Sequence, residues 1–177
     1  ETQPDFEESD AMVVFDTGEL RLEVLKRDGA MRVLDSAGNV LFDEPAGGGV
    51  VFDGETLGCV KKMPEDEHYY GFGEKTGPLD KRGERMVMWN TNMFYDDKRD
   101  PMYQSHPFFM TLRDGRAAGL FFDNTFKTVF DMGNGDPARY SFTAAGGELN
   151  YWVVAGPAPR DVLENYGELT GTMPLPP

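Results

Sequence analysis

Short apolar runs separated by turn residues constrain the fold of this chain more than any other feature. The segment Leu20–Leu25 reads Leu-Arg-Leu-Glu-Val-Leu, so one side of it is apolar and the other side is charged. This period of two is typical of a β-strand that is buried on one face. Asp28-Gly29 follows the segment, and such pairs supply the positive φ angles of tight hairpins. The pattern predicts strands joined by short hairpins.

The same pattern recurs along the rest of the chain. We expect further strands at Met12–Phe15, Met31–Leu34, Val50–Phe52, Thr56–Lys62, His68–Phe72, Arg85–Trp89, Phe108–Arg113, Ala118–Phe122, Phe126–Met132, Tyr140–Thr143 and Leu149–Val154. The clearest hairpin turns at Asp114-Gly115. The strand–helix alternation that builds a parallel sheet is not present. Many short strands at close spacing favour a mainly β protein, an antiparallel β-sandwich.

One helix is expected, from Pro159 to Thr170. Proline suits the first helical turn, and Gly171 suits the position after the last one. Four apolar side chains are predicted to share one face of this helix, namely Val162, Leu163, Tyr166 and Leu169. We therefore divide the chain into a flexible arm at residues 1–10, a β-sandwich domain at residues 11–156, and a helix with a proline-rich linker at residues 157–177.

Charge and composition exclude several classes of partner. The 177 residues are enough for one domain. A formal net charge of −14 repels phosphate backbones and anionic lipid, so we expect neither nucleic acid nor membrane as a partner. The single cysteine, Cys59, forms no disulfide within the chain and leaves the cellular compartment undetermined. We expect it to be a buried strand residue and not a nucleophile.

Four motifs between His68 and Gly133 carry a family resemblance. They read Gly71-Phe-Gly-Glu-Lys, Met88-Trp-Asn-Thr-Asn, Ser105-His-Pro-Phe-Phe and Gly119-Leu-Phe-Phe-Asp-Asn-Thr. Together they resemble the amino-terminal β-domain of glycoside hydrolase family 31, the α-glucosidase family. The tail from Gly156 onward resembles the segment that leads into the catalytic barrel of that family. The implied fold is a β-sandwich of the galactose-mutarotase-like, or supersandwich, type with one C-terminal helix.

The resemblance also implies where the chemistry is. A full enzyme of this family would hydrolyse terminal α-linked glucose, or a related sugar such as xylose, through a glycosyl-enzyme intermediate. Its nucleophile and its acid/base are both aspartates of the barrel, and no residue of this chain matches those motifs. We therefore assign no catalytic residue, expect no cofactor and predict that the chain alone is inactive. The implied partners are a catalytic barrel, which this chain lacks, and a carbohydrate substrate.

The segment Trp89–Tyr95 matches the one loop that the family's amino-terminal domain sends toward the sugar. The candidate substrate-binding residues of this loop are Thr91, Asn92, Phe94 and Tyr95. The resemblance points to Asn92, whereas Phe94 and Tyr95 are candidates because their flat apolar faces could pack on sugar rings. The family usually has an aspartate where this chain has Asn92, and an amide loses the charge-assisted bond but keeps an acceptor and adds donors. The alternative is that Asn92 is a turn residue with a local side-chain bond. Trp89, at the end of a strand, is expected to belong to the core.

Other chemical signals in the sequence are weak. The two glycines of Gly71-Phe-Gly-Glu-Lys lack the helix of a nucleotide-binding turn, so a bend or a close backbone approach is favoured, with Glu74 and Lys75 positioning the neighbouring loop. Two histidines, His68 and His106, make a poor case for a metal. Three acids, Asp96, Asp97 and Asp100, do not have the spacing of an EF-hand calcium loop.

Two alternative functions remain open. The chain could be a stand-alone carbohydrate-binding module, which would bind sugar by itself. It could also be a mutarotase-like epimerase, which would need a histidine and glutamate pair in one place. If a barrel normally covers one face of the sandwich, that apolar face would be exposed in the isolated chain, and we then expect self-association.

Overall fold

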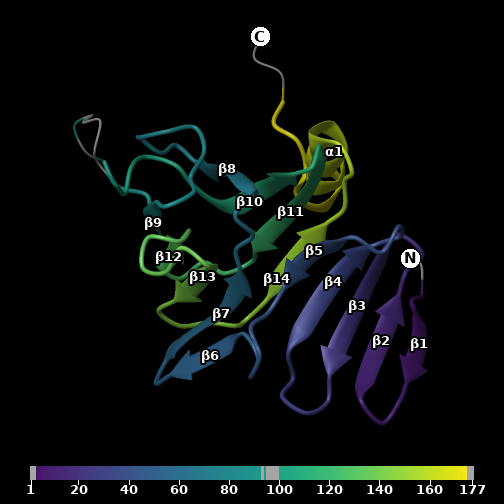
Figure 1. Cartoon of the computed structure of the whole chain (residues 1–177). Coiled ribbons are helices and arrows are strands. Elements are labelled where there is room, and N and C mark those ends of the chain that lie inside the picture. Colours follow the sequence, from purple (N-terminus) through teal and green to yellow (C-terminus); the bar gives the residue numbers. More distant parts are fainter. Residues whose placement is uncertain (1–2, 93, 95–99, 175–177) are drawn as a thin grey trace.

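The computed structural model describes residues 3–92, 94 and 100–174. The amino-terminal part forms a five-stranded sheet in the order β1-β2-β3-β4-β5. Its strands are β1 (Asp5–Glu8), β2 (Met12–Asp16), β3 (Leu20–Leu25), β4 (Met31–Asp35) and β5 (Val40–Asp43). This sheet stands to one side of the remaining elements (Figure 1).

Two further sheets form the sandwich, and all the pairs between described strands are antiparallel. One sheet has the order β6-β7-β13-β12-β9 and the other β14-β11-β10-β8. The strands of the first are β6 (Val50–Asp53), β7 (Thr56–Lys62), β9 (Arg85–Met88), β12 (Thr128–Asp131) and β13 (Arg139–Ala144). Those of the second are β8 (His68–Gly73), β10 (Ser105–Arg113), β11 (Arg116–Phe122) and β14 (Tyr151–Val154). The predicted mainly β, antiparallel sandwich is confirmed.

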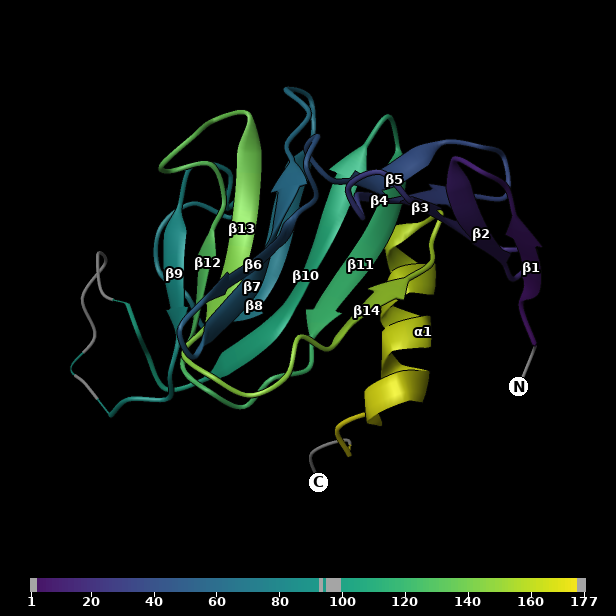
Figure 2. The same ribbon diagram turned by 90° about the horizontal axis from the view of Figure 1, so that it is seen from below.

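Aromatic side chains fill the space between the two sandwich sheets. Phe109 of β10, Phe130 of β12 and Phe142 of β13 are fully buried. The ring of Phe130 packs against those of both Phe109 and Phe142. Their neighbours along each strand point the other way, because side chains alternate across a sheet. Phe108, next to Phe109, therefore faces the opposite side of β10 and packs on the helix α1 (Pro159–Thr170), where it stacks on Tyr166 with ring centroids 3.9 Å apart. Figure 2 shows α1 against this outer face.

The helix begins and ends where the sequence predicts, but fewer of its apolar side chains pack on the sheet than expected. Val162 is fully buried against the sheet and Tyr166 contacts Phe108 and Phe121. Leu163 and Leu169, predicted on the same face, are exposed. One helix on a sheet buries only a narrow stripe, and Val162 and Tyr166, four residues apart, already occupy it.

Two short strands at the amino-terminal side were not predicted. Residues 1–10 were expected to be a flexible arm, yet Asp5–Glu8 pairs with β2 and Phe6 packs on Phe15 with ring centroids 5.4 Å apart. Residues Val40–Asp43 form β5, which completes the same sheet. β1 (Asp-Phe-Glu-Glu) contains a single apolar residue and β5 (Val-Leu-Phe-Asp) has three in a row, so neither shows the alternation of a half-buried strand.

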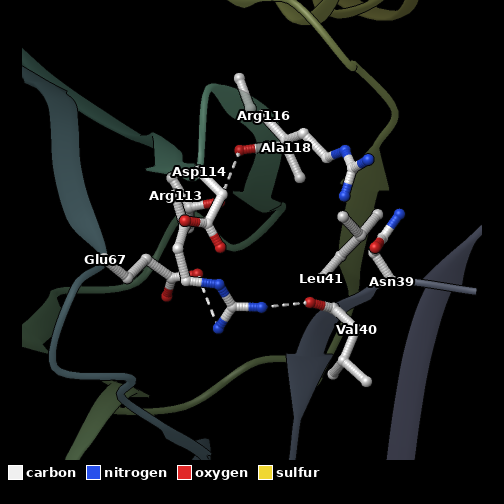
Figure 3. A pocket seen from close by; sticks show the side chains of 10 residues that line it. Asn39, Val40, Leu41, Glu67, Arg113, Asp114, Arg116 and Ala118 are labelled. Atoms are coloured by element: carbon white, nitrogen blue, oxygen red, sulfur yellow. Dashed lines mark hydrogen bonds and ion pairs between the residues drawn. The ribbon is translucent and has the colours of Figure 1, made fainter.

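Arg113 connects the sandwich to the amino-terminal sheet. From the end of β10 its guanidinium donates to the carbonyl of Val40 in β5 over 2.8 Å and lies 3.9 Å from the carboxylate of Glu67. Burial raises the pKa of the Glu67 carboxyl, although the hydrogen bond from Tyr69 and the charge of Arg113 oppose this shift. Arg113, Glu67 and Val40 line part of a small cavity of about 60 Å³ (Figure 3), which is too small for a sugar ring.

A buried ion pair joins all three sheets. Lys61 of β7 donates to Glu44, directly after β5, over 2.6 Å, and to the hydroxyl of Tyr151 in β14 over 2.9 Å. The side chains of Lys61 and Glu44 are 2% and 0% exposed. Glu44 also accepts hydrogen bonds from the backbone N–H groups of Met31 and Gly49. The carboxylate is therefore paired and hydrogen-bonded, as a charge buried at this depth requires.

Substitution of Lys61 tests this junction. Lys61→Met leaves the Glu44 carboxylate buried without its counter-charge, and we expect it to lower the free energy of unfolding by about 3–5 kcal/mol in urea titrations at pH 7. The neighbouring residue provides the control. Lys62 pairs with Asp43 over 2.7 Å but is 53% exposed, so Lys62→Met should change stability by less than about 1 kcal/mol. Equal losses of stability in the two variants would contradict the role of the Lys61–Glu44 pair at this junction.

Candidate functional site

The loop that carries the predicted sugar-binding residues leaves β9 and returns at β10. The amide of Trp89 donates to the Ser105 hydroxyl over 3.0 Å, and the amide of Ser105 donates to the Asn90 side chain over 2.8 Å. The amide of Thr91 donates to the carbonyl of Met102 over 2.9 Å. We call residues 87–91 and 100–105 the loop base. Its two sides are thus joined by hydrogen bonds, and the loop leaves the sandwich from a fixed position.

The motif Gly71-Phe-Gly-Glu-Lys packs against this loop base. Its first three residues, Gly71 to Gly73, all have positive φ, namely 124°, 72° and 81°. A side chain on Gly73 would place its Cβ 2.8 Å from the backbone of both Gln104 and His106. The amide of Glu74 donates to the carbonyl of Gln104 over 3.0 Å. The expected bend and close backbone approach are both present, and β10 shifts register beside them, between Ser105 and Phe109.

The structure describes three of the four candidate residues, and these three differ in exposure. Thr91 is half-buried in the loop base, and its hydroxyl donates to the carbonyl of Trp89 over 3.3 Å. Asn92 is exposed just beyond the loop base. Phe94 is 92% exposed, an orientation that leaves its ring free to meet a ligand or another surface. Tyr95 lies outside the described residues, so its assignment to the site stays a prediction.

Trp89 was expected in the core, and that expectation is wrong. The indole is 52% exposed. Met86 and Met88 of β9 are only 4% and 6% exposed, so their side chains point into the core. A residue one position further along faces outward, because the side-chain period of a strand is two. The alternation within Arg85–Trp89 is the signal that would have placed Trp89 correctly.

An aromatic hollow of about 490 Å³ lies beside the loop base. Trp89, Phe121 and Phe126 provide its apolar surface, and Asn90 and Ser105 provide polar groups. Flat rings beside amides and hydroxyls are the surface on which sugar rings or apolar side chains pack. The half-exposed Phe126 was expected within a strand, but β12 begins two residues later, at Thr128.

The described part of the chain offers no metal site and no activated nucleophile. His68 Nδ1 lies 2.7 Å from an Asp80 carboxylate oxygen, and no group of three His, Cys, Asp or Glu among the described residues could hold a metal ion. Burial raises the pKa of the Cys59 thiol to about 12, so it carries no thiolate at neutral pH and is not a nucleophile. No described helix is both long and apolar enough to cross a bilayer.

A family model with the description "Glycosyl hydrolase 31 N-terminal galactose mutarotase-like domain" matches residues 1–131. The chain belongs to this glycosyl hydrolase 31 domain family. The resemblance in the sequence motifs is thereby confirmed, as is the galactose-mutarotase-like type of the sandwich.

Relatives of known sequence are glycosyl hydrolases several times longer. Alpha-glucosidase 2 of Bacillus thermoamyloliquefaciens is 48% identical over 173 residues, which are 96% of this chain and 22% of that protein. An alpha-glucosidase of Saccharolobus solfataricus is 37% identical over 129 residues, 72% of this chain and 19% of that protein. This glycosyl hydrolase 31 domain therefore spans about a fifth of the length of these relatives.

The fold also matches solved structures. A glycosyl hydrolase 31 dextranase of Flavobacterium johnsoniae, solved with isomaltotriose, superposes with a TM-score of 0.92 at 35% sequence identity. The alignment covers 98% of this chain and 21% of the dextranase. The cycloalternan-forming enzyme of Listeria monocytogenes superposes with a TM-score of 0.87 at 24% identity, which supports the fold alone.

A glycine substitution tests the close approach of the motif to the loop base. Gly73→Ala adds a left-handed strain of about 1–2 kcal/mol and a clash with backbone atoms that should cost a further 1–3 kcal/mol or so. Gly83 is the matched control, since its φ is 82° and a Cβ there would meet nothing within 4 Å. In urea titrations Gly83→Ala should lower the free energy of unfolding only by the strain, whereas Gly73→Ala should lower it by the strain and the clash together. Equal losses of stability would show that the approach is not tight.

Proposed function

We propose that this chain is the non-catalytic amino-terminal domain of an α-glucosidase-like hydrolase. One observation carries the proposal: 96% of this chain aligns with only 22% of an alpha-glucosidase that is 48% identical. In this proposal the rest of such an enzyme supplies a catalytic barrel with both reactive carboxylates. The domain supports the barrel, and the loop beyond the loop base contributes one wall of the substrate pocket.

The geometry of the loop supports a role in substrate contact. Asn92 offers an exposed amide with donors and an acceptor for sugar hydroxyls. Phe94 offers an exposed apolar ring. The hydrogen bonds of the loop base restrict the motion of the chain on either side of them, which lowers the entropy lost when a substrate binds. Thr91 takes part through that network, and Tyr95 belongs to the proposed wall on the family resemblance.

The proposed substrate is a terminal α-linked glucose or a related sugar. Two relatives that match this chain are named alpha-glucosidases, and an alpha-xylosidase of Lactiplantibacillus pentosus is 32% identical over 115 residues. The related dextranase was solved with isomaltotriose and, separately, with glucose. An amide at position 92 in place of the usual aspartate should weaken one bond to a sugar hydroxyl without removing it.

The aromatic hollow favours a second candidate, a carbohydrate-binding module that acts alone. Trp89 and Phe126 are half-exposed there beside the polar side chains of Asn90 and Ser105. Calorimetric titration of the isolated chain with glucose, maltose and xylose separates the two functions. A domain that forms only part of a pocket should give no measurable heat of binding, whereas micromolar binding would favour the module.

Replacement of Asn92 tests the contact with substrate. In the enzyme that this chain forms together with the barrel proposed here, Asn92→Ala should lower kcat/KM for a terminal α-glucoside up to about tenfold, the value of one hydrogen bond. Asn165→Ala on α1 is the control, because this side-chain amide is exposed and donates to the carbonyl of Ala155, away from the loop base. Identical kinetics for both variants and the wild type would contradict the assignment of Asn92.

The isolated chain should self-associate through the aromatic hollow. Trp89 and Phe126 are exposed at the hollow, and Trp152 pairs with the lining residue Phe121 across β14 and β11. We expect sedimentation velocity to show association that grows with concentration, and Trp89→Gln to reduce it. Leu79→Gln, at a position 82% exposed and outside the lining of the hollow, should not. A strictly monomeric chain at high concentration, with no binding of an apolar dye, would disprove this.

A further inference from the structure

A lysine at the start of the loop region is buried, although lysine is seldom buried without a partner. Lys75 follows the bend at Gly71-Phe72-Gly73, and its side chain is 1% exposed. Its ammonium group donates to the Asp100 carboxylate over 2.8 Å and to the carbonyl of Val87 over 2.7 Å. Three segments that are separate in sequence therefore meet at one charge.

Asp100 completes the arrangement from the returning side of the loop. One carboxylate oxygen accepts from Lys75, and the other accepts a hydrogen bond from the amide of Val87. Its side chain is 22% exposed, so the ion pair is largely shielded from solvent. Asp100 thus has partners on both oxygens, and both partners belong to segments other than its own.

The position of Val87 explains what the two side chains do. β9 is the edge strand of its sheet, and in an antiparallel strand the N–H and C=O of alternate residues face away from the paired neighbour. Val87 presents both groups to Lys75 and Asp100. The ion pair thus takes the hydrogen bonds that a further strand would take, and it closes the free edge of β9 where the loop begins.

Backbone strain in the same motif supports a specific role for this arrangement. Phe72 is fully buried and has a φ of 72°, an angle that a bulky residue adopts only when its surroundings impose it. Phe72 stacks on Phe109 and meets Phe130 edge to face. The core holds the phenyl ring, and the turned backbone then directs the chain toward the loop base, where Lys75 contacts Val87.

We propose that Lys75 is a positioning residue, which acts with Asp100 to fix the loop base and, through it, the place of Asn92 relative to a bound sugar. The inference rests on the proposed function, because it needs the loop to contact substrate. Lys75 itself touches no substrate in this account. Its effect passes through the Val87 backbone and Asp100 to the two ends of the loop.

Hydrogen exchange of the 177-residue chain tests the structural part. In Lys75→Met the amides of Val87, Thr91 and Ser105 should exchange about 10- to 100-fold faster, as expected for the loss of hydrogen bonds to a charged group. Amides in the β7–β13 ladder should keep their protection. Lys62→Met is the matched control, since its ion pair with Asp43 is exposed, and it should change neither region. Unchanged exchange at the loop base, or an equal loss of amide protection in all three sheets, would overturn the proposal.

Kinetics of the enzyme proposed above test the functional part. Lys75→Met should raise KM for a terminal α-glucoside up to about tenfold, because a displaced Asn92 loses most of the hydrogen bond that it offers the sugar. Asp100→Asn should act on the same interaction, so the double variant should be less affected than the two single effects predict together.

The outcomes separate this inference from the proposed function. If Asn92→Ala lowers kcat/KM and Lys75→Met leaves both kinetic constants unchanged, the positioning role is wrong and the proposed function stands. If neither variant changes the kinetics, the loop does not contact substrate, and both the positioning role and the proposed pocket wall are wrong.

Discussion

The contact of Lys61 with Glu44 and Tyr151 is the interaction on which the arrangement of the sheets depends. Each of the three residues belongs to, or directly follows, a different sheet. A buried charge is tolerated only when its partners are held in place, so this ion pair favours one relative placement of the amino-terminal sheet and the sandwich. Arg113 adds a second link between the same parts through Val40. The apolar packing of the core is less directional than these polar contacts.

The described structure separates a buried core from an exposed loop segment. The sandwich and α1 bury the large apolar side chains, while the segment after β9 leaves exposed an amide at Asn92 and a ring at Phe94. The loop base holds both ends of that segment on the sandwich. The two alpha-glucosidases that match this domain are about five times as long as the chain. A rigid support that presents a few polar and aromatic groups to a pocket completed by other residues accounts for both observations.

The sequence predicted strands and turns correctly where alternating apolar residues or a turn pair marked them. The alternation in Leu20–Leu25 and the Asp114-Gly115 turn, where both residues have positive φ, gave β3 and the β10–β11 hairpin correctly. The four-residue β5 was missed because its pairing depends on β4 more than on its own pattern. Motif resemblance pointed to the loop and to Lys75 as a structural residue. It could not show that Lys75 meets Asp100, because that contact joins positions 25 residues apart through a buried backbone edge.

The central claim is that this domain shapes a glycan pocket while the reactive carboxylates are on other polypeptide. Its most direct test is to incubate the purified 177-residue chain with maltose and with 4-nitrophenyl α-glucoside and to measure the release of glucose and nitrophenol. The account predicts no release above that in buffer. Turnover of either substrate that follows the amount of the chain, and that is lost when the chain is unfolded, would contradict it.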